Sequence, residues 1–142
     1  MDKCSDVMTT HVVSGFKEDT VAAIAALMKR EDVGPIPIVE DKQTNKLIGI
    51  VTDRDLVVKV IADGLDPKTT KVKDVMTNKV VACKVDDKID KAMDAMAKYQ
   101  LRRIPVVESG DKLVGIIAQA DIATRVDEAK KTAEMVKDIS RP

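Results

Sequence analysis

The pattern of apolar and polar residues predicts the same series of elements twice along the chain. A short β-branched run comes first, and a helix follows in which apolar residues recur at helical spacing. Two apolar strands joined by a polar tip come next, and a second helix closes the series. In the first half, these elements are predicted at residues 12–13, 21–28, 36–39, 47–51 and 53–62. Each half therefore has the predicted order β-α-β-β-α.

The second half of the chain also repeats residues of the first. Matching segments lie 68 residues apart at first and 66 apart after the polar tip, which is two residues shorter in the second copy. A hairpin tip tolerates such a change because it lies at the surface. The matched pairs are 7–9 with 75–77, 36–40 with 104–108, and 47–51 with 113–117. The repeat indicates two related units with two related clefts.

We therefore predict an α+β fold of two β-α-β-β-α repeats packed with pseudo-two-fold symmetry. Each half alone would be marginally stable, so we expect the halves to share one core. The predicted division is repeat one at 1–64, a linker at 65–72, repeat two at 73–127 and a helical tail at 128–142.

Composition excludes several classes of partner. Basic and acidic residues both number 24, so bulk charge attracts neither nucleic acid nor an anionic membrane. Phe16 and Tyr99 are the only aromatic residues, which weighs against base stacking on single strands. No export signal or apolar run of membrane-spanning length is present, so a cytoplasmic location is expected.

The residues of reactive chemistry are few and scattered. Cys4 and Cys83 lie 79 positions apart with no second pair, which gives neither a disulfide framework nor a zinc pattern. We expect two buried thiols without a role, and no metal site. His11, the only histidine, is expected at the surface. No P-loop, dinucleotide fingerprint or nucleophile beside a base is present, so no catalytic residue and no enzyme is predicted.

The densest functional signal is the strand-to-helix turn at 49–55. Thr52 places a hydroxyl at the first helical turn, where backbone N–H groups suit a phosphate. Asp55 follows three residues later, and its oxygens suit the vicinal hydroxyls of a ribose. Both residues could instead simply cap the helix, and the motif alone leaves this open. The second copy keeps the carboxylate as Asp121 but has Ala118 in place of the threonine.

These motifs resemble a pair of cystathionine β-synthase (CBS) domains, also called a Bateman module. The resemblance covers residues 3–126 and rests on the D-V-M-T opening, the strand with an internal proline and the G-h-x-T-x-x-D turn, which recur in both copies except that Ala118 replaces the threonine. The layout is similar to short stand-alone prokaryotic CBS-pair proteins of the hypoxic-response type. The resemblance implies a regulatory module that binds AMP, ADP, ATP or another adenosyl compound in clefts between the repeats, with no required cofactor.

Carried over position by position, the resemblance implies a main site and a weaker one. In the main site, Thr52 would hold phosphate, Asp55 the ribose diol, and Arg54 would lie at the edge. Its walls would come from both repeats, namely Gly34, Pro35, Ile36, Met76, Val81, Leu101 and Arg102. Because Ala118 departs from the family pattern, phosphate binding is in doubt at the weaker site, formed by Asp121, Arg103, Arg102, Met8, Val13 and Val33.

Arg102 and Arg103 have two interpretations. Adjacent arginines ahead of a buried strand are often only solvated charge. Their counterparts in the first copy are Gly34 and Pro35, so the charge is confined to one copy, where the resemblance implies phosphates. A guanidinium suits phosphate because its donors lie in one plane. We expect at least one of the two to bind phosphate.

Three function classes remain: a regulatory ligand-binding module, a dimerising scaffold that has lost its ligand, and, least favoured, an enzyme. Ala118 and the absence of an attached effector domain favour the scaffold. A homodimer is expected because apolar patches mark interfaces. The apolar positions are Leu56, Val57, Val60, Ile61, Ile122 and Val126. Expected partners are thus an adenine-containing small molecule, a second copy and an unidentified effector protein.

Overall fold

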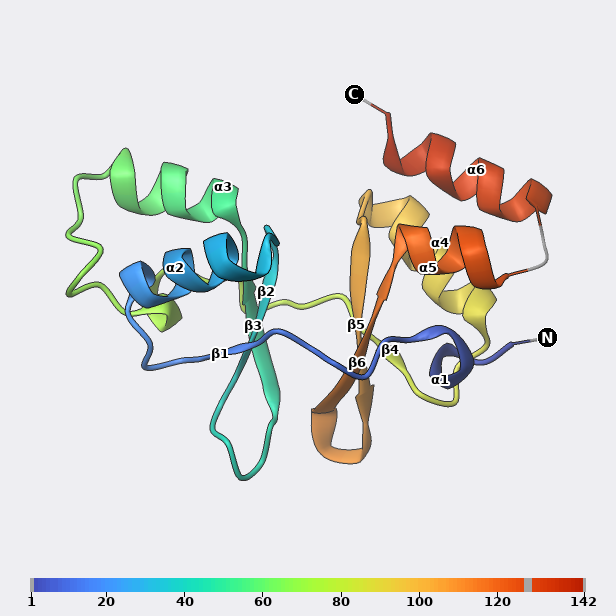
Figure 1. The fold of residues 1–142 in the computed structure, drawn as a ribbon, viewed down its shortest axis with the longest axis horizontal. Coiled ribbons are helices and arrows are strands. Elements are labelled where there is room, and N and C mark those ends of the chain that lie inside the picture. Colours follow the sequence, from blue (N-terminus) through green and yellow to red (C-terminus); the bar gives the residue numbers. More distant parts are fainter. Residues whose placement is uncertain (1, 127–128, 142) are drawn as a thin grey trace. The chain divides into compact units, whose positions relative to one another are not determined.

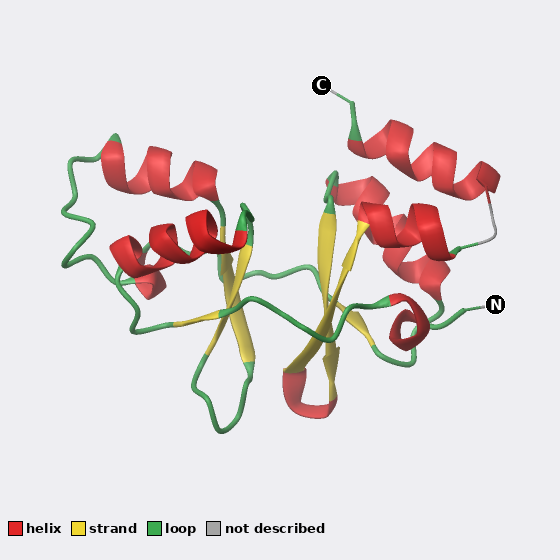
Figure 2. Ribbon diagram, in the orientation of Figure 1, coloured by secondary structure: helices red, strands yellow, loops and turns green. Residues whose placement is uncertain are grey.

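A computed structural model describes residues 2–126 and 129–141 (Figure 1). The chain forms two compact units, each with its own three-stranded sheet and helices (Figure 2). We name each after the residue that distinguishes its site. The Thr52 unit is residues 13–80, and the Ala118 unit is residues 1–12 with 81–142. The α+β fold is confirmed, whereas the expected single core is wrong, because each unit buries a separate apolar cluster.

The Thr52 unit follows the predicted order of elements, but its first strand lies at Gly15–Phe16 and not at the predicted residues 12–13. Its elements are β1 Gly15–Phe16, α2 Val21–Glu31, β2 Ile36–Val39, β3 Leu47–Val51, α3 Asp53–Asp55 with a π-helical continuation Leu56–Ile61, and a 3-10 turn Val72–Asp74. Strand β2 lies between β1, to which it is parallel, and β3, to which it is antiparallel. Thr20 caps the start of helix α2, and its hydroxyl accepts the Ala23 N–H at 3.2 Å. Asp32 follows the last helical residue, and its φ of +53° turns the chain out of the helix.

The Ala118 unit repeats this series and adds a helix. Its elements are α1 Cys4–Val7, β4 Cys83–Lys84, α4 Ile89–Tyr99, β5 Arg103–Glu108, a 3-10 turn Ser109–Asp111, β6 Lys112–Ala118, α5 Gln119–Arg125 and α6 Ala129–Ile139. The sheet has the order β4-β5-β6 with the same strand directions. Of the predicted tail at 128–142, α6 packs on α4 and α5, and residues 128 and 142 lie outside the described chain.

Each unit contains the D-V-M-T segment that precedes the other sequence repeat. Thr9 exchanges two backbone hydrogen bonds with Ile116 of β6, at 2.8 and 3.0 Å. Thr77 makes the same pair with Ile50 of β3, at 2.8 and 3.0 Å. The folded units are therefore different stretches of chain from the repeats predicted at 1–64 and 73–127.

Two glycines make room for this exchange. Met8 lies where a Cβ of Gly115 would project, and Met76 lies where a Cβ of Gly49 would project. Any larger residue at either glycine would displace the methionine. The D-V-M-T methionines are thus packing residues of the last strand in each unit.

The helical faces of the two units differ in their cover. In the Ala118 unit, α6 buries Met135 and Ile139 against the core. Residues 13–80 contain no counterpart of α6. Four apolar side chains are exposed there, namely Val57 (54%), Val58 (46%), Ile61 (72%) and Leu65 (44%).

The expected interface residues were partly wrong. Leu56, Val60 and Ile122 are buried in the cores of their own units, because they occupy the helix faces that pack on the sheets. Val57 and Ile61 lie on the exposed side. Within the described part of the chain, no helix has the length and apolar character of a membrane span.

Candidate functional site

The turn from β3 to α3 holds Thr52 and Asp55 in a reciprocal pair of hydrogen bonds. The Thr52 hydroxyl accepts the Asp55 N–H at 3.2 Å, and Asp55 Oδ2 accepts the Thr52 N–H at 3.0 Å. This is a capping box, so both residues satisfy the start of the helix. The Thr52 hydroxyl hydrogen is not used in that bond, and it remains a donor for a ligand oxygen.

The second oxygen of Asp55 also has a partner within the unit. Asp55 Oδ1 lies 3.3 Å from Nζ of Lys59, one helical turn later, and the carboxylate is 17% exposed. Lys59 in turn donates to the Val75 carbonyl at 3.0 Å. The same lysine therefore holds the aspartate and the D-V-M-T segment, and a ribose hydroxyl would share Asp55 with it.

The turn from β6 to α5 keeps half of this arrangement. Asp121 Oδ2 accepts the Ala118 N–H at 2.8 Å, but Ala118 offers no oxygen to the helix in return. Arg125 occupies the position of Lys59, and its Nη1 donates to the Val7 carbonyl at 2.8 Å. Among the described residues, Asp121 has no ion pair that corresponds to the one between Asp55 and Lys59.

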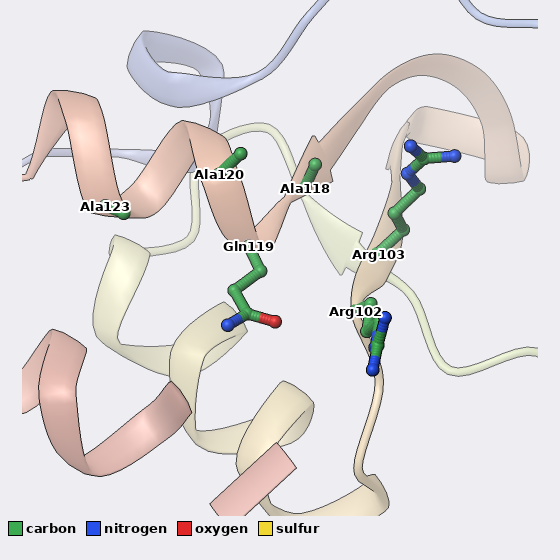
Figure 3. Close-up of a pocket in the computed structure, with 6 residues that line it drawn as sticks. All are labelled: Arg102, Arg103, Ala118, Gln119, Ala120 and Ala123. Carbon is green, nitrogen blue, oxygen red and sulfur yellow. The ribbon is translucent and has the colours of Figure 1, made fainter. Parts of the chain in front are cut away.

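A hollow of about 310 Å³ lies at this second turn, wholly within the Ala118 unit. Figure 3 shows the residues that line the hollow. The side chains of Arg102 and Arg103 extend in different directions. The lining residues are Arg102, Arg103, Ala118, Gln119, Ala120 and Ala123. The volume is at the small end of the range for ligand pockets, about 300–1,000 Å³.

Strand register explains why the arginines lie at this turn. Arg103 is paired with Ala118 across β5 and β6, and the Gln119 N–H donates to the Arg102 carbonyl at 2.8 Å. In the Thr52 unit, the equivalent pairing ends at Ile36 with Val51, so Pro35 and Thr52 come next. The corresponding positions are thus Thr52 and Pro35 in one unit, and Ala118 and Arg103 in the other.

The residues proposed for the two sites are divided between the units. The Thr52 unit contains Gly34, Pro35, Ile36, Thr52, Arg54, Asp55, Met76, Val13 and Val33. The Ala118 unit contains Met8, Val81, Leu101, Arg102, Arg103 and Asp121. Ile36 is fully buried in the core, and its side chain is part of that packing. Within single units the structure joins Thr52 with Asp55 and brings Arg102 and Arg103 to the Ala118 turn. The assignment of all these residues to ligand sites stays a prediction.

Sequence reasoning did not single out Gln119, Ala120 and Ala123 as lining residues. Their residue types gave little indication of a role, because two are alanines and a polar residue at a helix start is common. The repeat gave a better indication for Gln119, which follows Ala118 as Asp53 follows Thr52.

A family comparison identifies the chain. The model of the CBS domain matches it twice, over residues 4–62 and 72–128. The chain belongs to the CBS-domain family. Among its relatives, Hypoxic response protein 1 of Mycobacterium tuberculosis is 34% identical over all of this chain and 96% of its own length. The CBS-pair resemblance drawn from the motifs is therefore confirmed.

Solved structures of CBS proteins share this fold. The crystal structure of Hypoxic Response Protein I with two coordinated zinc ions has a TM-score of 0.79 and 33% identity, covering 89% of this chain and 100% of that one. The CBS pair of MJ0100, in complex with 5′-methylthioadenosine and S-adenosyl-L-methionine, has a TM-score of 0.73 and 25% identity, covering 92% and 98%. The cytosolic domain of the Mg²⁺ channel MgtE in complex with ATP has a TM-score of 0.73 and 29% identity, covering 86% and 48%.

One of these neighbours, Hypoxic Response Protein I, contains coordinated zinc ions. Within residues 2–126 and 129–141, no three histidine, cysteine, aspartate or glutamate side chains are grouped so as to hold a metal ion.

Proposed function

We propose that this CBS pair is a regulatory module that binds an adenine nucleotide or another adenosyl compound. The observation that carries the proposal is the hollow beside Ala118, which Arg102 and Arg103 line, at a turn whose Ala118 N–H donates to Asp121. Guanidinium groups suit phosphate, and a carboxylate suits a ribose diol. A nucleotide presents both groups in one molecule.

The two turns are proposed to bind unequally, with Thr52 and Asp55 as the stronger site. Thr52 would donate its hydroxyl hydrogen to a phosphate, and Asp55 would accept from the ribose. Adenine would lie among aliphatic side chains, because aromatic residues are nearly absent. Neighbours with an adenosyl ligand or ATP support this class of ligand.

Thermal-shift measurements with AMP, ADP, ATP, S-adenosylmethionine and adenosine test the proposal. A ligand that binds only the folded state adds about 2.7 kcal/mol at 100 times its Kd. Arg102→Met and Arg103→Met should weaken the response to phosphate-bearing ligands and spare adenosine. Arg30→Met, on the exposed side of α2, is the matched control. If no ligand in the panel raises the unfolding temperature, the proposal is wrong.

A dimerising scaffold is the second candidate, favoured by the exposed face of Val57, Val58 and Ile61. Under this alternative, sedimentation shows a dimer while no adenosyl compound changes the unfolding temperature. For either function we propose that the protein lacks turnover, so incubated ATP should stay intact.

A further inference from the structure

The two cysteines of the chain come together in the Ala118 unit. Cys4 belongs to α1 and Cys83 begins β4, although 79 positions separate them in sequence. Both are free thiols, buried to 0 and 4% exposure in the same apolar cluster. Each thiol is the largest cause of the pKa shift of the other, which makes the two side chains neighbours in this cluster. Burial was expected from the sequence, but this pairing was not.

Backbone contacts hold the two segments together independently of the thiols. The Cys4 N–H donates to the Asp87 carbonyl at 2.8 Å, and the Ser5 N–H donates to the Val85 carbonyl at 3.1 Å. The backbones of Lys3 and Lys88 form an isolated antiparallel β-bridge. The start of α1 is therefore fixed along the segment that follows Cys83.

The two thiols differ in chemical character. The Cys83 thiol lowers the pKa of Cys4, and nearby Lys91 adds to this against burial and Asp87. The Cys4 thiol and burial raise the pKa of Cys83. Since the thiolate is the nucleophile, Cys4 is the better attacking group.

Access to solvent also favours Cys4 as the first thiol to react. Helix α1 has four residues and lies near the N-terminus, where local opening is easiest. Cys83 lies in the sheet, paired with Val106, and its thiol contacts the Pro105 carbonyl at 3.7 Å. Opening of α1 thus exposes Cys4 while Cys83 stays in place.

We propose that Cys4 and Cys83 are a redox pair that forms an intramolecular disulfide, with a low-molecular-weight disulfide as oxidant. The Cys4 thiolate attacks one sulfur of the oxidant, which releases one thiolate and leaves a mixed disulfide on Cys4. Cys83 then loses its proton and attacks the Cys4 sulfur, which releases the second thiolate. The two protein protons pass to the two released thiolates. The cysteines are oxidised, and one oxidant is reduced to two thiols.

This disulfide would close a ring that contains the whole Thr52 unit. The chain leaves the Ala118 unit after Val12 and returns at Val81, and both crossings lie between the two cysteines. The bond would also fix α1, whose Val7 carbonyl is held by Arg125. Oxidation would therefore lock the D-V-M-T segment onto β6 and raise the unfolding temperature.

The test equilibrates the full chain with reduced and oxidised glutathione at graded ratios, followed by thiol counting and peptide mass mapping. The expected product has no free thiol, no adduct and a peptide linked through Cys4 and Cys83. Cys83→Ala should accumulate a glutathione adduct on Cys4, whereas Cys4→Ala should stay unmodified. Circular dichroism establishes that each variant is folded. The peptide map of the wild-type protein decides the proposal even if a variant fails to fold. Two free thiols at every glutathione ratio, or a disulfide between two chains, would overturn it.

Reaction rates give a matched control. Arg125→Met removes the bond that holds α1, so it should speed oxidation roughly tenfold if opening of α1 controls access. Lys59→Met removes the equivalent bond in the Thr52 unit, which contains no cysteine, and should leave the rate unchanged. Equal acceleration by both variants would contradict the proposed route through α1.

Discussion

The two strand-to-helix turns keep one frame and change one polar group. In both, an aspartate accepts the N–H of the residue just before the helix, at 3.0 Å for Asp55 and 2.8 Å for Asp121. The residue pair at this point differs, because Thr52 and Pro35 come just beyond the last strand pair of one unit, whereas Ala118 is paired with Arg103 in the other. The shared aspartate is thus part of the fold, and the variable pair is where ligand preference can differ.

The two turns also differ in the basic residue that lies one helical turn after the aspartate. Lys59 contacts both Asp55 and the Val75 carbonyl, whereas Arg125 contacts the Val7 carbonyl. Both cations hold the exchanged D-V-M-T segment, but only Lys59 also forms an ion pair with its aspartate among the described residues. A ligand at Asp55 would meet a positive charge already in place, and a ligand at Asp121 would depend on the arginines of the hollow.

The largest expected effect concerns the helix that covers one unit only. Met135→Ala should destabilise the protein by about 2–5 kcal/mol, because it leaves a cavity in the core that α6 completes. Hydrogen exchange should rise in β5 and β6 and stay unchanged in β2 and β3, since the units have separate cores. Glu134→Ala, an exposed change in the same helix, should have little effect. Equal exchange in both sheets would mean that the units unfold together.

Exchanging the threonine and alanine tests the difference between the turns directly. Thr52→Ala should weaken AMP binding by about 1.5–3 kcal/mol, roughly tenfold to 150-fold, and barely change adenosine binding. Asp55→Ala should weaken both ligands, because ribose is common to them. Ala118→Thr should create or strengthen a second site. Calorimetry measures all three variants, and unchanged AMP affinity in Thr52→Ala would show that the asymmetry has no effect on binding.

Self-association should depend on the face without a covering helix. Val57 and Val58 correspond to Ala123 and Thr124 of α5, and both valines are exposed. The double change Val57→Ala and Val58→Thr should weaken a homodimer about tenfold, because it removes apolar area from the interface. Sedimentation velocity over a concentration series measures this. Thr124→Val is the reverse exchange and should leave the dimer unchanged; a monomeric starting protein would contradict the prediction.

Local pattern was enough to predict the series of elements. Helical spacing after Thr20 and the paired apolar runs at 36–39 and 47–51 gave elements that the structure confirms within one or two residues at most ends. These features depend on neighbours in sequence, so a single chain carries them. The capping box also follows from the spacing of Thr52 and Asp55.

Features that depend on distant segments were out of reach. The exchange of D-V-M-T segments pairs Thr9 with Ile116, and the repeat alone does not say which copy a segment packs on. The contact of Cys4 with Cys83 arises from the same exchange. Leu56 and Val60 were predicted at an interface because helical spacing shows an apolar stripe without showing what covers it.

The smallest effect concerns an ion-pair cluster present in the Thr52 unit. Glu18 lies 2.5 Å from Nζ of Lys71 and 2.9 Å from Nζ of Lys73, and these bonds lower its pKa from 4.5 to about 2. A carboxylate with a lowered pKa in the folded state contributes stability above its unfolded pKa. This contribution is lost as the pH falls from about 4.5 toward 2.

The difference in stability between wild type and Glu18→Gln should therefore be largest near neutral pH and vanish near pH 2, as measured by urea unfolding at several pH values. Salt should also reduce it, because the side chains are about half exposed. In the Ala118 unit, Asp86 corresponds to Glu18. Lys3 corresponds to Lys71, but Ser5 replaces Lys73, so one of the two lysines is missing. Asp86→Asn is the matched variant in that unit. A constant difference for Glu18→Gln across the whole pH range would assign its effect to packing instead of charge.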